Sequence, residues 1–442
     1  MTPAPPLMTD WNRKAELVRA ALPEGGLFAE KSWRISPEPF VISLTELRQL
    51  EALGPILLRF QKTCDLLYRR SRGGSLPSWI AGYLDRGKPT ELLDAGLAPA
   101  VLGEAPRVIR PDLILTPEGF SAAELDSVPG GIGLTAWLGE IYAGLDSTHQ
   151  IVGGPRGMLD GFGAIFAKGG ADILVSRESA DYRPEMSWLA DRLEGDWKVE
   201  EAENYEVGGR DVYRFFELFD LPNIPAAGSL MKAASRGEIE VTAPFKPWLE
   251  EKLWSALFWS HPLREVWHRE LREANWKRLS HLFPRSWVVD PAEVPHHAVI
   301  PGLEIQRFEE LKSFSQKERE LVLKLSGFNE RAWGGRSVTV GQDASQTEWG
   351  TAVDNAISSF EEAPYVLQRF HAGRIVNHPW WNEATGTMEQ MEGRVRLCPY
   401  YFVNATSSKV SLGGVLATIC PSDKKILHGM KDAILVPCRV ES

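Results

Sequence analysis

Three carboxylates lie close together in one short stretch of the sequence. Asp112 is followed by Glu124, and Asp126 comes two positions later. Residues two apart on a strand project to the same face, and a tight hairpin would bring residues 112 and 124 opposite each other. Carboxylates gathered in this way repel one another unless a hard cation lies among them. Asp112, Glu124 and Asp126 are therefore predicted to bind Mg²⁺, and a solvated acidic face is the alternative.

A second candidate centre lies much further along the chain. Lys324 ends an apolar segment, and such a cation is costly to bury unless an anion meets it. Gly327, Gly334 and Gly335 follow this lysine, and glycine lets backbone N–H groups approach phosphate oxygens closely. The pattern favours a phosphate-binding cradle under a glycine-rich flap. An edge-strand lysine beside an ordinary hairpin is the alternative.

An apolar strand that enters a turn follows the glycines, at residues 364–370. An adenine ring needs an apolar slot with donors and acceptors at its edge. Gln368 can meet an exocyclic amine, and its neighbours Leu367 and Phe370 offer apolar surface. Together with the lysine segment, this strand predicts an ATP site. Taken alone, it would more often be a core strand.

The elements that must position these residues can be read from hydrophobic periodicity and from turn residues. A hairpin is expected at the acids, because Thr116–Gly119 places proline and glycine between two apolar strands. Alternation of helices and strands predicts a small α/β unit over residues 155–225. The expected helical stretches are residues 1–75 and 245–283, and strands with glycine turns are expected after residue 284.

Bulk properties narrow the function classes. The formal net charge is -10, which argues against a nucleic-acid binder with a basic face. The sequence shows neither a run of 18 apolar residues nor a signal peptide at its beginning. The four cysteines form no C-x-x-C pair, so we expect reduced thiols that pack in a core. A cytoplasmic protein that acts without membrane or nucleic acid is the expectation.

These motifs resemble those of the ATP-grasp superfamily. Its metal motif is an Asp followed by Glu-x-Asn or Glu-x-Asp, and in ordinary members it lies after the lysine and the hinge strand. Here it lies before them, which is similar to the circularly permuted group related to glutathionylspermidine synthetase. The segments that carry the likeness are Arg110–Asp112, Glu124–Gly131, Glu392–Tyr400 and Gly413–Gly414. The resemblance covers roughly residues 105–442.

The resemblance implies a role for each matching residue. Lys324 and Lys252 would bind ATP, with adenine held by Gln368 and its neighbours. The three acids would bind two Mg²⁺ ions. Arg110 and either Arg394 or Arg396 would be catalytic, and the sequence does not choose between the last two. The loop that begins at Ser127, with Gly130 and Gly131, would meet the substrate. Arg369 departs from the family pattern, in which an acid often occupies that position.

The implied fold is α+β, a circularly permuted ATP-grasp with an inserted Rossmann-like, pre-ATP-grasp α/β unit and an N-terminal helical segment. The expected divisions are an N-terminal helical segment (1–75), a metal hairpin with a substrate loop (76–150), a Rossmann-like unit (151–230) and the nucleotide-binding lobes (231–442). The implied activity is ATP-dependent ligation of a carboxylate to an amine or thiol through an acyl phosphate. The alternatives are a non-catalytic ATP-grasp scaffold and a phosphotransferase.

Two further glycine motifs compete with this interpretation. Gly82–Lys88 matches the start of a P-loop, but Pro89 replaces the hydroxyl residue that would bind Mg²⁺. We interpret that match as chance. Gly131–Ala136 matches a dinucleotide fingerprint, but an acidic Glu-x-Asp precedes it and no strand-end acid follows at the required distance. A Rossmann oxidoreductase is therefore only a distant alternative to a substrate or phosphate loop.

Overall fold

The chain divides into two compact units that are interleaved along the sequence. The computed structural model describes residues 6–24, 26, 27, 33–332, 337–429 and 432–441. The first unit comprises Met1–Leu58, Glu104–Pro244 and Gly373–Ser442, and the second comprises Arg59–Gly103 and Phe245–Ala372. Each unit is therefore built from segments that lie far apart in the sequence.

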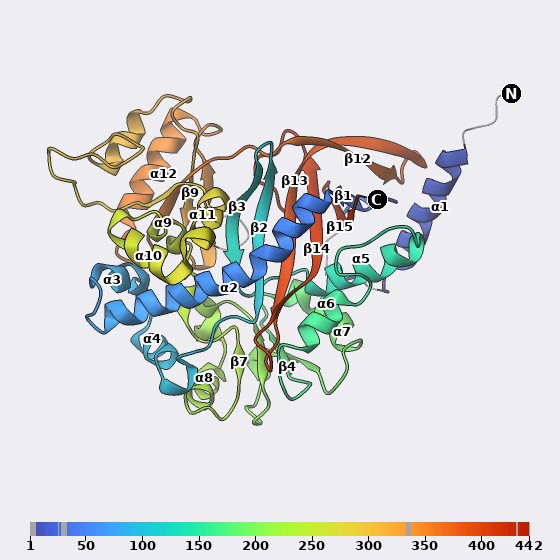
Figure 1. The fold of residues 1–442 in the computed structure, drawn as a ribbon, viewed down its shortest axis with the longest axis horizontal. Helices are drawn as coiled ribbons and strands as arrows, with labels where there is room; N and C mark the ends of the chain where they lie inside the picture. Colours follow the sequence, from blue (N-terminus) through green and yellow to red (C-terminus); the bar gives the residue numbers. More distant parts are fainter. Residues whose placement is uncertain (1–5, 25, 28–32, 333–336, 430–431, 442) are drawn as a thin grey trace. The chain divides into compact units, whose positions relative to one another are not determined.

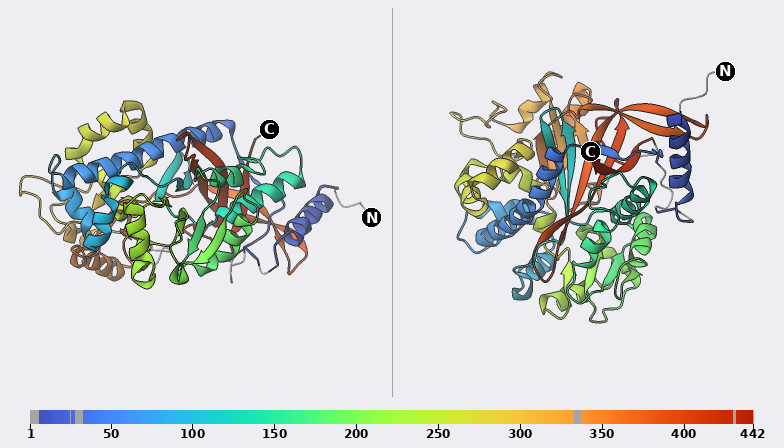
Figure 2. Two further views of the ribbon diagram at one scale, coloured as in Figure 1. Left: turned by 90° about the horizontal axis from the view of Figure 1, so that it is seen from below. Right: turned by 45° about the vertical axis from the view of Figure 1, so that its right-hand side comes forward.

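A seven-stranded sheet organises the first unit. Its strands follow the order β1-β15-β14-β13-β2-β3, and β12 also pairs with β13. Long, twisted β13 and β14 run side by side, and β13 also runs beside β2 (Figures 1 and 2). All pairs are antiparallel except β1 with β15. The strands are β1 (Phe40–Ile42), β2 (Val108–Thr116), β3 (Gly119–Asp126), β12 (Ile375–Asn382), β13 (Thr387–Val403), β14 (Val410–Pro421) and β15 (Ile434–Val440).

A second, parallel sheet belongs to the same unit. It has four strands in the order β5-β4-β6-β7, and every pair in it is parallel. Parallel neighbours need crossover connections, and α-helices lie in those from β4 to β5 and from β6 to β7. The strands are β4 (Asp172–Val175), β5 (Lys198–Glu201), β6 (Val212–Phe215) and β7 (Val241–Thr242). Helices of this unit are α1 (Pro6–Ala20), α5 (Ile132–Leu145), α6 (Gly157–Gly163), α7 (Arg183–Ala190) and α8 (Ala227–Ser235).

The second unit contains a four-stranded antiparallel sheet in the order β10-β9-β11-β8. Its strands are β8 (Ser286–Val288), β9 (Leu321–Leu325), β10 (Val338–Val340) and β11 (Tyr365–Arg369). Helix α2 (Leu44–Arg72) begins in the first unit and ends in the second. The other helices of the second unit are α3 (Trp79–Asp85), α4 (Thr90–Gly96), α9 (Leu253–Leu257), α10 (Arg264–Leu271), α11 (Glu273–Leu282) and α12 (Gln346–Ser358).

Alternation along β9 decides which face of this sheet is buried. Leu321 and Leu323 point to one side, where they join a core cluster with Trp349 of α12. Residues of opposite parity, including Lys324, point to the other side. Helix α12 is fixed at its start by a capping box, in which Ser345 and Glu348 each bond the other's backbone N–H. The apolar pattern of β9 thus leaves its lysine on the face away from this core.

The mixed α+β class expected from the sequence is confirmed, because the described residues form several sheets together with α-helices. The hairpin expected at the acids forms β2 and β3, joined at Thr116–Gly119. The four expected divisions of the chain stay a prediction, and the two compact units each combine parts of several of them. Helices α3 and α4 belong to the second unit, while the neighbouring β2 belongs to the first. Strands β12–β15 also lie in the first unit rather than with the lysine strand, because β13 pairs with β2.

The described residues bear on two expectations, those on membrane-spanning segments and on the cysteines. Within them no helix is long and apolar enough to span a membrane. All four cysteines are buried and free, as expected for core thiols.

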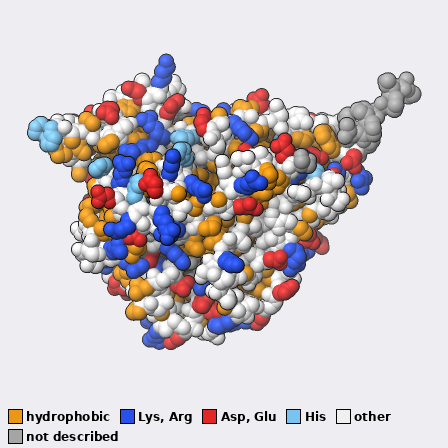
Figure 3. Space-filling model, viewed as in Figure 1, with side chains coloured by type: hydrophobic (Ala, Val, Ile, Leu, Met, Phe, Trp, Pro, Cys, Tyr) orange, Lys and Arg blue, Asp and Glu red, His pale blue; other side chains and the backbone are white. Residues whose placement is uncertain are grey.

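Lys and Arg side chains gather over α10, α11 and the C-terminal part of α2 in Figure 3, although the chain is acidic. Glu270 partly neutralises that gathering, because it contacts Arg70 and Arg269.

Candidate functional site

Strands β2 and β3 bring the predicted acids onto one face of the first sheet. Arg110 pairs with Asp126 and Asp112 pairs with Glu124 in the register of the hairpin. Positions 110 and 112 share a face, as do 124 and 126, so four charged side chains project together. Strand β13 adds Arg396 beside Ile114, which places it on the same face. The motif in the N-terminal half of the chain and the arginine near its C-terminus therefore meet.

Arg110 and Arg396 clamp Asp112 between two guanidinium groups. Arg110 Nε donates to Asp112 Oδ1 at 2.9 Å, and Arg396 Nη1 donates to Oδ2 at 2.8 Å. Arg110 Nη2 also donates to Asp126 Oδ2 at 2.9 Å. The carboxylates are thus neutralised by arginine. This pairing covers Asp112 and Asp126, while the charges of Glu124 and Asp112 still raise the pKa of Asp126, as the expected repulsion among the three acids implies.

The two neutralised acids differ in their electrostatics. Burial raises the pKa of Asp112, but Arg110 and Arg396 outweigh burial and hold that pKa below its usual value. Burial raises the pKa of Asp126, and Arg110 opposes this only in part. Glu124 differs from both because its side chain is exposed. Cys398 lies behind Asp112, with Sγ 3.5 Å from Oδ1, and burial raises the pKa of its thiol to about 12.

The structure distinguishes the two candidate arginines of β13. Arg394 donates to backbone carbonyls, at 3.0 Å to Ser422 and 2.7 Å to Gly373. Arg396 instead contacts Asp112, and its Nε is buried without a hydrogen-bond partner in the part of the chain that the structure describes. Thr418, opposite Arg396 in the register of β14, has an unpartnered buried hydroxyl within the same described residues. Arg396 Nε is therefore the buried donor that a phosphoryl or carboxylate oxygen could satisfy.

The predicted substrate loop is tied into the protein. The carbonyl of Gly130 accepts hydrogen bonds from Arg110 at 3.0 Å and from Tyr400 Oη at 2.7 Å. The N–H of Gly131 donates to Glu185 Oε1 at 2.7 Å, and the N–H of Leu134 donates to Oε2 at 2.9 Å. The buried carboxylate of Glu185 therefore occupies the N-terminus of α5, where an anion is favoured.

A phosphate loop at Gly131 stays a prediction, and it would require the amide of Gly131 to leave its present acceptor. That amide serves Glu185, and the left-handed backbone of Gly131, with φ of 84°, suits glycine. The dinucleotide alternative is not supported either, because β3 lies in an antiparallel sheet. Ser127 is buried next to Asp126. Contact of Ser127, Gly130 and Gly131 with a substrate stays a prediction.

The donor set around Asp112 bears on whether a magnesium ion fits. Among the described residues, no group of three or more His, Cys, Asp or Glu side chains is arranged to hold a metal ion. Both oxygens of Asp112 accept from arginine, and Asp126 accepts from Arg110 and from the N–H of Val128. The side chains as placed do not form a magnesium site. Their role as metal ligands stays a prediction that requires them to rearrange.

In the second unit, Lys324 and Gln368 lie on one face of neighbouring strands. Lys324 Nζ donates to Gln368 Oε1 at 2.7 Å, and Gln368 Nε2 donates to Ser286 Oγ at 3.2 Å. The amide of Gln368 therefore contacts both Lys324 and Ser286, and its contact with adenine stays a prediction. Leu367 packs in the core on the opposite face, and β11 has a partner strand on each side. The N–H of Phe370 donates to the carbonyl of Glu320.

The flap can be described only at its base. Gly334 and Gly335 lie outside the described residues. Gly327 follows β9, and a Cβ there would lie 2.1 Å from the carbonyl oxygen of Glu250. Lys252 Nζ donates to the carbonyl of Ala332 at 3.2 Å. Gly327 and Lys252, predicted separately to bind nucleotide, therefore belong to two segments that pack against each other.

Sequence reasoning missed several residues of these clusters. Lys88 and Glu251 form a buried ion pair beside Gly327, and Glu185 caps α5. The P-loop-like match did end at Lys88, but the structure shows a different local fold. Gly82 lies inside α3, and the lysine follows the end of that helix. No signal in the sequence pointed to Glu185 or Glu251, because their partners are backbone groups and residues far away along the chain.

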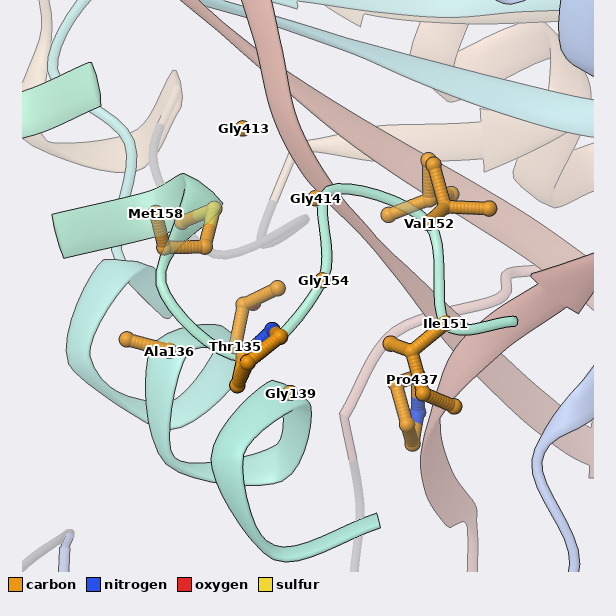
Figure 4. Close-up of a pocket in the computed structure, with 12 residues that line it drawn as sticks. Thr135, Ala136, Gly139, Ile151, Val152, Gly154, Met158, Gly413, Gly414 and Pro437 are labelled. Atoms are coloured by element: carbon orange, nitrogen blue, oxygen red, sulfur yellow. The ribbon is translucent and has the colours of Figure 1, made fainter. Parts of the chain in front are cut away.

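A small cavity in the first unit lies apart from the predicted site residues (Figure 4). Its walls come mainly from α5, the segment at 151–158 and the glycine pair of β14. The cavity has room for about one water molecule. None of the predicted site residues lines it. The cavity is too small for a substrate.

Comparisons with known proteins give a likeness in fold. No family model matches the chain, and no curated protein matches it. A glutathione synthetase-like effector from Globodera pallida, solved in its apo form, superposes with a TM-score of 0.53 at 10% identity, covering 99% of this chain and 98% of that one. A putative gamma-glutamylcysteine synthetase from Methylobacillus flagellatus gives a TM-score of 0.36 at 9% identity, covering 89% and 87%. The first comparison shows that this chain shares the fold of the effector along almost its whole length.

Proposed function

We propose that the protein is an ATP-dependent ligase that joins a carboxylate to an amine or a thiol. The observation that carries this proposal is the convergence of Arg110, Asp112, Asp126 and Arg396 on one face of one sheet. These residues come from two motifs that resemble the permuted ATP-grasp enzymes. The fold is also shared with a protein described as a glutathione synthetase-like effector, and that description supports a ligase.

The proposed reaction has two steps. A substrate carboxylate attacks the γ-phosphorus of ATP, and the bond to ADP breaks. The amine or thiol then attacks the acyl phosphate, and inorganic phosphate leaves. Positioning and charge neutralisation dominate catalysis in phosphoryl transfer. Arg110 and Arg396 would supply positive charge, and the unpartnered Nε of Arg396 would donate to an oxygen of the transferred group. Asp112, Glu124 and Asp126 are the predicted ligands of magnesium, a role that would require Asp112 and Asp126 to release their arginine partners.

Lys324 is proposed to bind the phosphates of ATP. Its amine already contacts Gln368, so that a phosphate would join an existing polar pair. Charge-assisted hydrogen bonds are worth about 1.5–3 kcal/mol. Lys324→Met is therefore expected to weaken ATP binding about tenfold, measured by titration calorimetry. Lys277→Met, which removes an exposed lysine of α11, is the matched control. Equal ATP affinity in the wild type and the Lys324 variant would remove this assignment.

The proposed acyl phosphate can be tested by trapping it. With ATP, magnesium and a panel of amino acid and dipeptide carboxylates, hydroxylamine should trap the acyl phosphate as a hydroxamate, with ADP as the nucleotide product. AMP and pyrophosphate would indicate adenylation and reject the proposal. A stable phosphorylated alcohol would indicate a phosphotransferase. Tight ATP binding without turnover on any acid of the panel would favour a non-catalytic scaffold.

A further inference from the structure

A buried ion pair lies at the base of the predicted flap. Lys88 Nζ contacts Glu251 Oε1, and the two side chains are 0% and 1% exposed. Burying a charge pair often costs as much free energy as the pair returns, so such a pair is weak evidence for stability. The loop that presents the lysine is tightly constrained. Gly87 has a φ of 68°, and a Cβ there would lie 2.1 Å from the carbonyl oxygen of Glu362.

The second carboxylate oxygen of Glu251 holds the start of the flap. Oε2 accepts from the hydroxyl of Ser326 and from the N–H of Gly327 at 3.1 Å. These residues directly follow β9, which carries Lys324. A single carboxylate, that of Glu251, therefore joins the Lys88 loop to the first two residues after β9.

The segment that contains Glu251 also contacts the other end of the described flap. Lys252, its neighbour, donates to the carbonyl of Ala332. Gly327 packs so closely on the carbonyl of Glu250 that only glycine fits there. Residues 250–252 thus contact the flap at Ser326–Gly327 and again at Ala332. A shift of residues 250–252 would therefore move both of these flap contacts together.

We propose that Lys88 and Glu251 are positioning residues for nucleotide binding. Glu251 fixes the flap base and Lys252 in their binding geometry, and Lys88 balances the buried charge of Glu251. This inference rests on the proposed ATP-dependent function and adds two residues that the ATP-grasp resemblance does not supply. The pair acts through the acceptor oxygen that Glu251 offers to Ser326 and Gly327, and through no contact of its own with ATP.

Two double variants separate positioning from mere folding. Lys88→Met with Glu251→Gln removes both charges but keeps an acceptor for Gly327. Lys88→Met with Glu251→Leu removes the charges and the acceptor at similar volume. Neither leaves an unpaired buried charge, so both should fold. The Gln variant should bind ATP within about threefold of wild type, and the Leu variant about tenfold more weakly. Adenosine, which lacks phosphates, should bind both variants equally. Equal ATP affinity in the two variants would overturn the proposal.

A measurement without nucleotide makes the outcome independent of the proposed function. In the Leu variant, the amide of Gly327 should exchange with deuterium about tenfold faster than in the Gln variant, because its acceptor is lost. Equal exchange rates would overturn the positioning role. Lys246→Met with Asp65→Asn removes another buried pair of the second unit, with Nζ and Oδ1 3.1 Å apart, and should leave exchange at Gly327 unchanged. A wild type that binds no ATP would refute the proposed function, whereas the exchange comparison would still decide this inference.

Discussion

Two arginine side chains next to Asp112 lower the pKa of its carboxyl group and so change how its charge affects stability. Asp112 is buried and accepts hydrogen bonds from Arg110 and Arg396. Its lowered pKa keeps it charged to lower pH than an ordinary aspartate. The folded form therefore gains stability from this charge above the unfolded pKa, and the gain is lost as pH falls through the folded pKa. Glu124, only twelve positions away, is exposed.

Removing the charge of Asp112 should therefore destabilise the protein. Asp112→Asn leaves two guanidinium groups without their carboxylate, and breaking a buried pair costs about 3 kcal/mol or more. Glu124→Gln should change the free energy of unfolding by less than about 0.5 kcal/mol. Urea denaturation of both variants measures the difference. If the two substitutions cost the same, the guanidinium clamp is not what holds this face together.

At the scale of elements, β13 connects distant parts of the sequence. It pairs with β2, β12 and β14, and it carries Arg394, Arg396 and Cys398 at alternate positions of one face. The long strand positions the catalytic candidates because its register against β2 is fixed by apolar neighbours such as Leu397 and Leu113. A shift of one residue would turn every charged side chain of β13 to the opposite face.

Strand β12 contains a buried histidine that should make stability depend on pH. His378 Nε2 lies 3.1 Å from both Ser36 Oγ and the carbonyl oxygen of Glu38. Burial lowers the pKa of His378 from 6.5 to about 4. The unfolded chain takes up this proton first as pH falls. The stabilisation is therefore complete above about pH 6.5 and is lost towards pH 4, by up to about 3 kcal/mol.

His378→Gln should weaken that dependence on pH. Chemical denaturation at several pH values between 7 and 4 gives the slope for the wild type and for the variant. The pKa of His149 is also lowered by burial, and this residue is unchanged in both proteins. The difference between the two slopes therefore isolates His378. Identical slopes would show that His378 is not protonated on unfolding in this range.

At the scale of the whole molecule, the second unit is assembled from two separate segments. Asp65 and Lys88 come from Arg59–Gly103, whereas their partners Lys246 and Glu251 come from Phe245–Ala372. Two buried ion pairs therefore link the segments. A fragment that contains only one segment keeps one buried charge of each pair without its partner, and such charges are strongly destabilising.

The isolated fragment 245–372 is accordingly expected not to unfold cooperatively. Each missing partner should cost about 3–5 kcal/mol, which is comparable to the whole stability of a small domain. A single chain that joins residues 59–103 to 245–372 by a flexible linker restores both partners and should show a cooperative transition. Thermal melting followed by circular dichroism compares the two. Cooperative melting of the short fragment would contradict the role of these pairs.

The sequence by itself determined the mixed class, the hairpin at the acids and the strand that carries Lys324, because these follow from local alternation and turn residues. The tertiary structure decided what each charge contacts. Arg396 and Asp112 are 284 positions apart, and no local rule could pair them. Glu185 and Glu251 bind backbone N–H groups of distant segments, a kind of partner that leaves no pattern in the sequence. Side-chain spacing therefore located the candidate residues, and strand register selected the contacts among them.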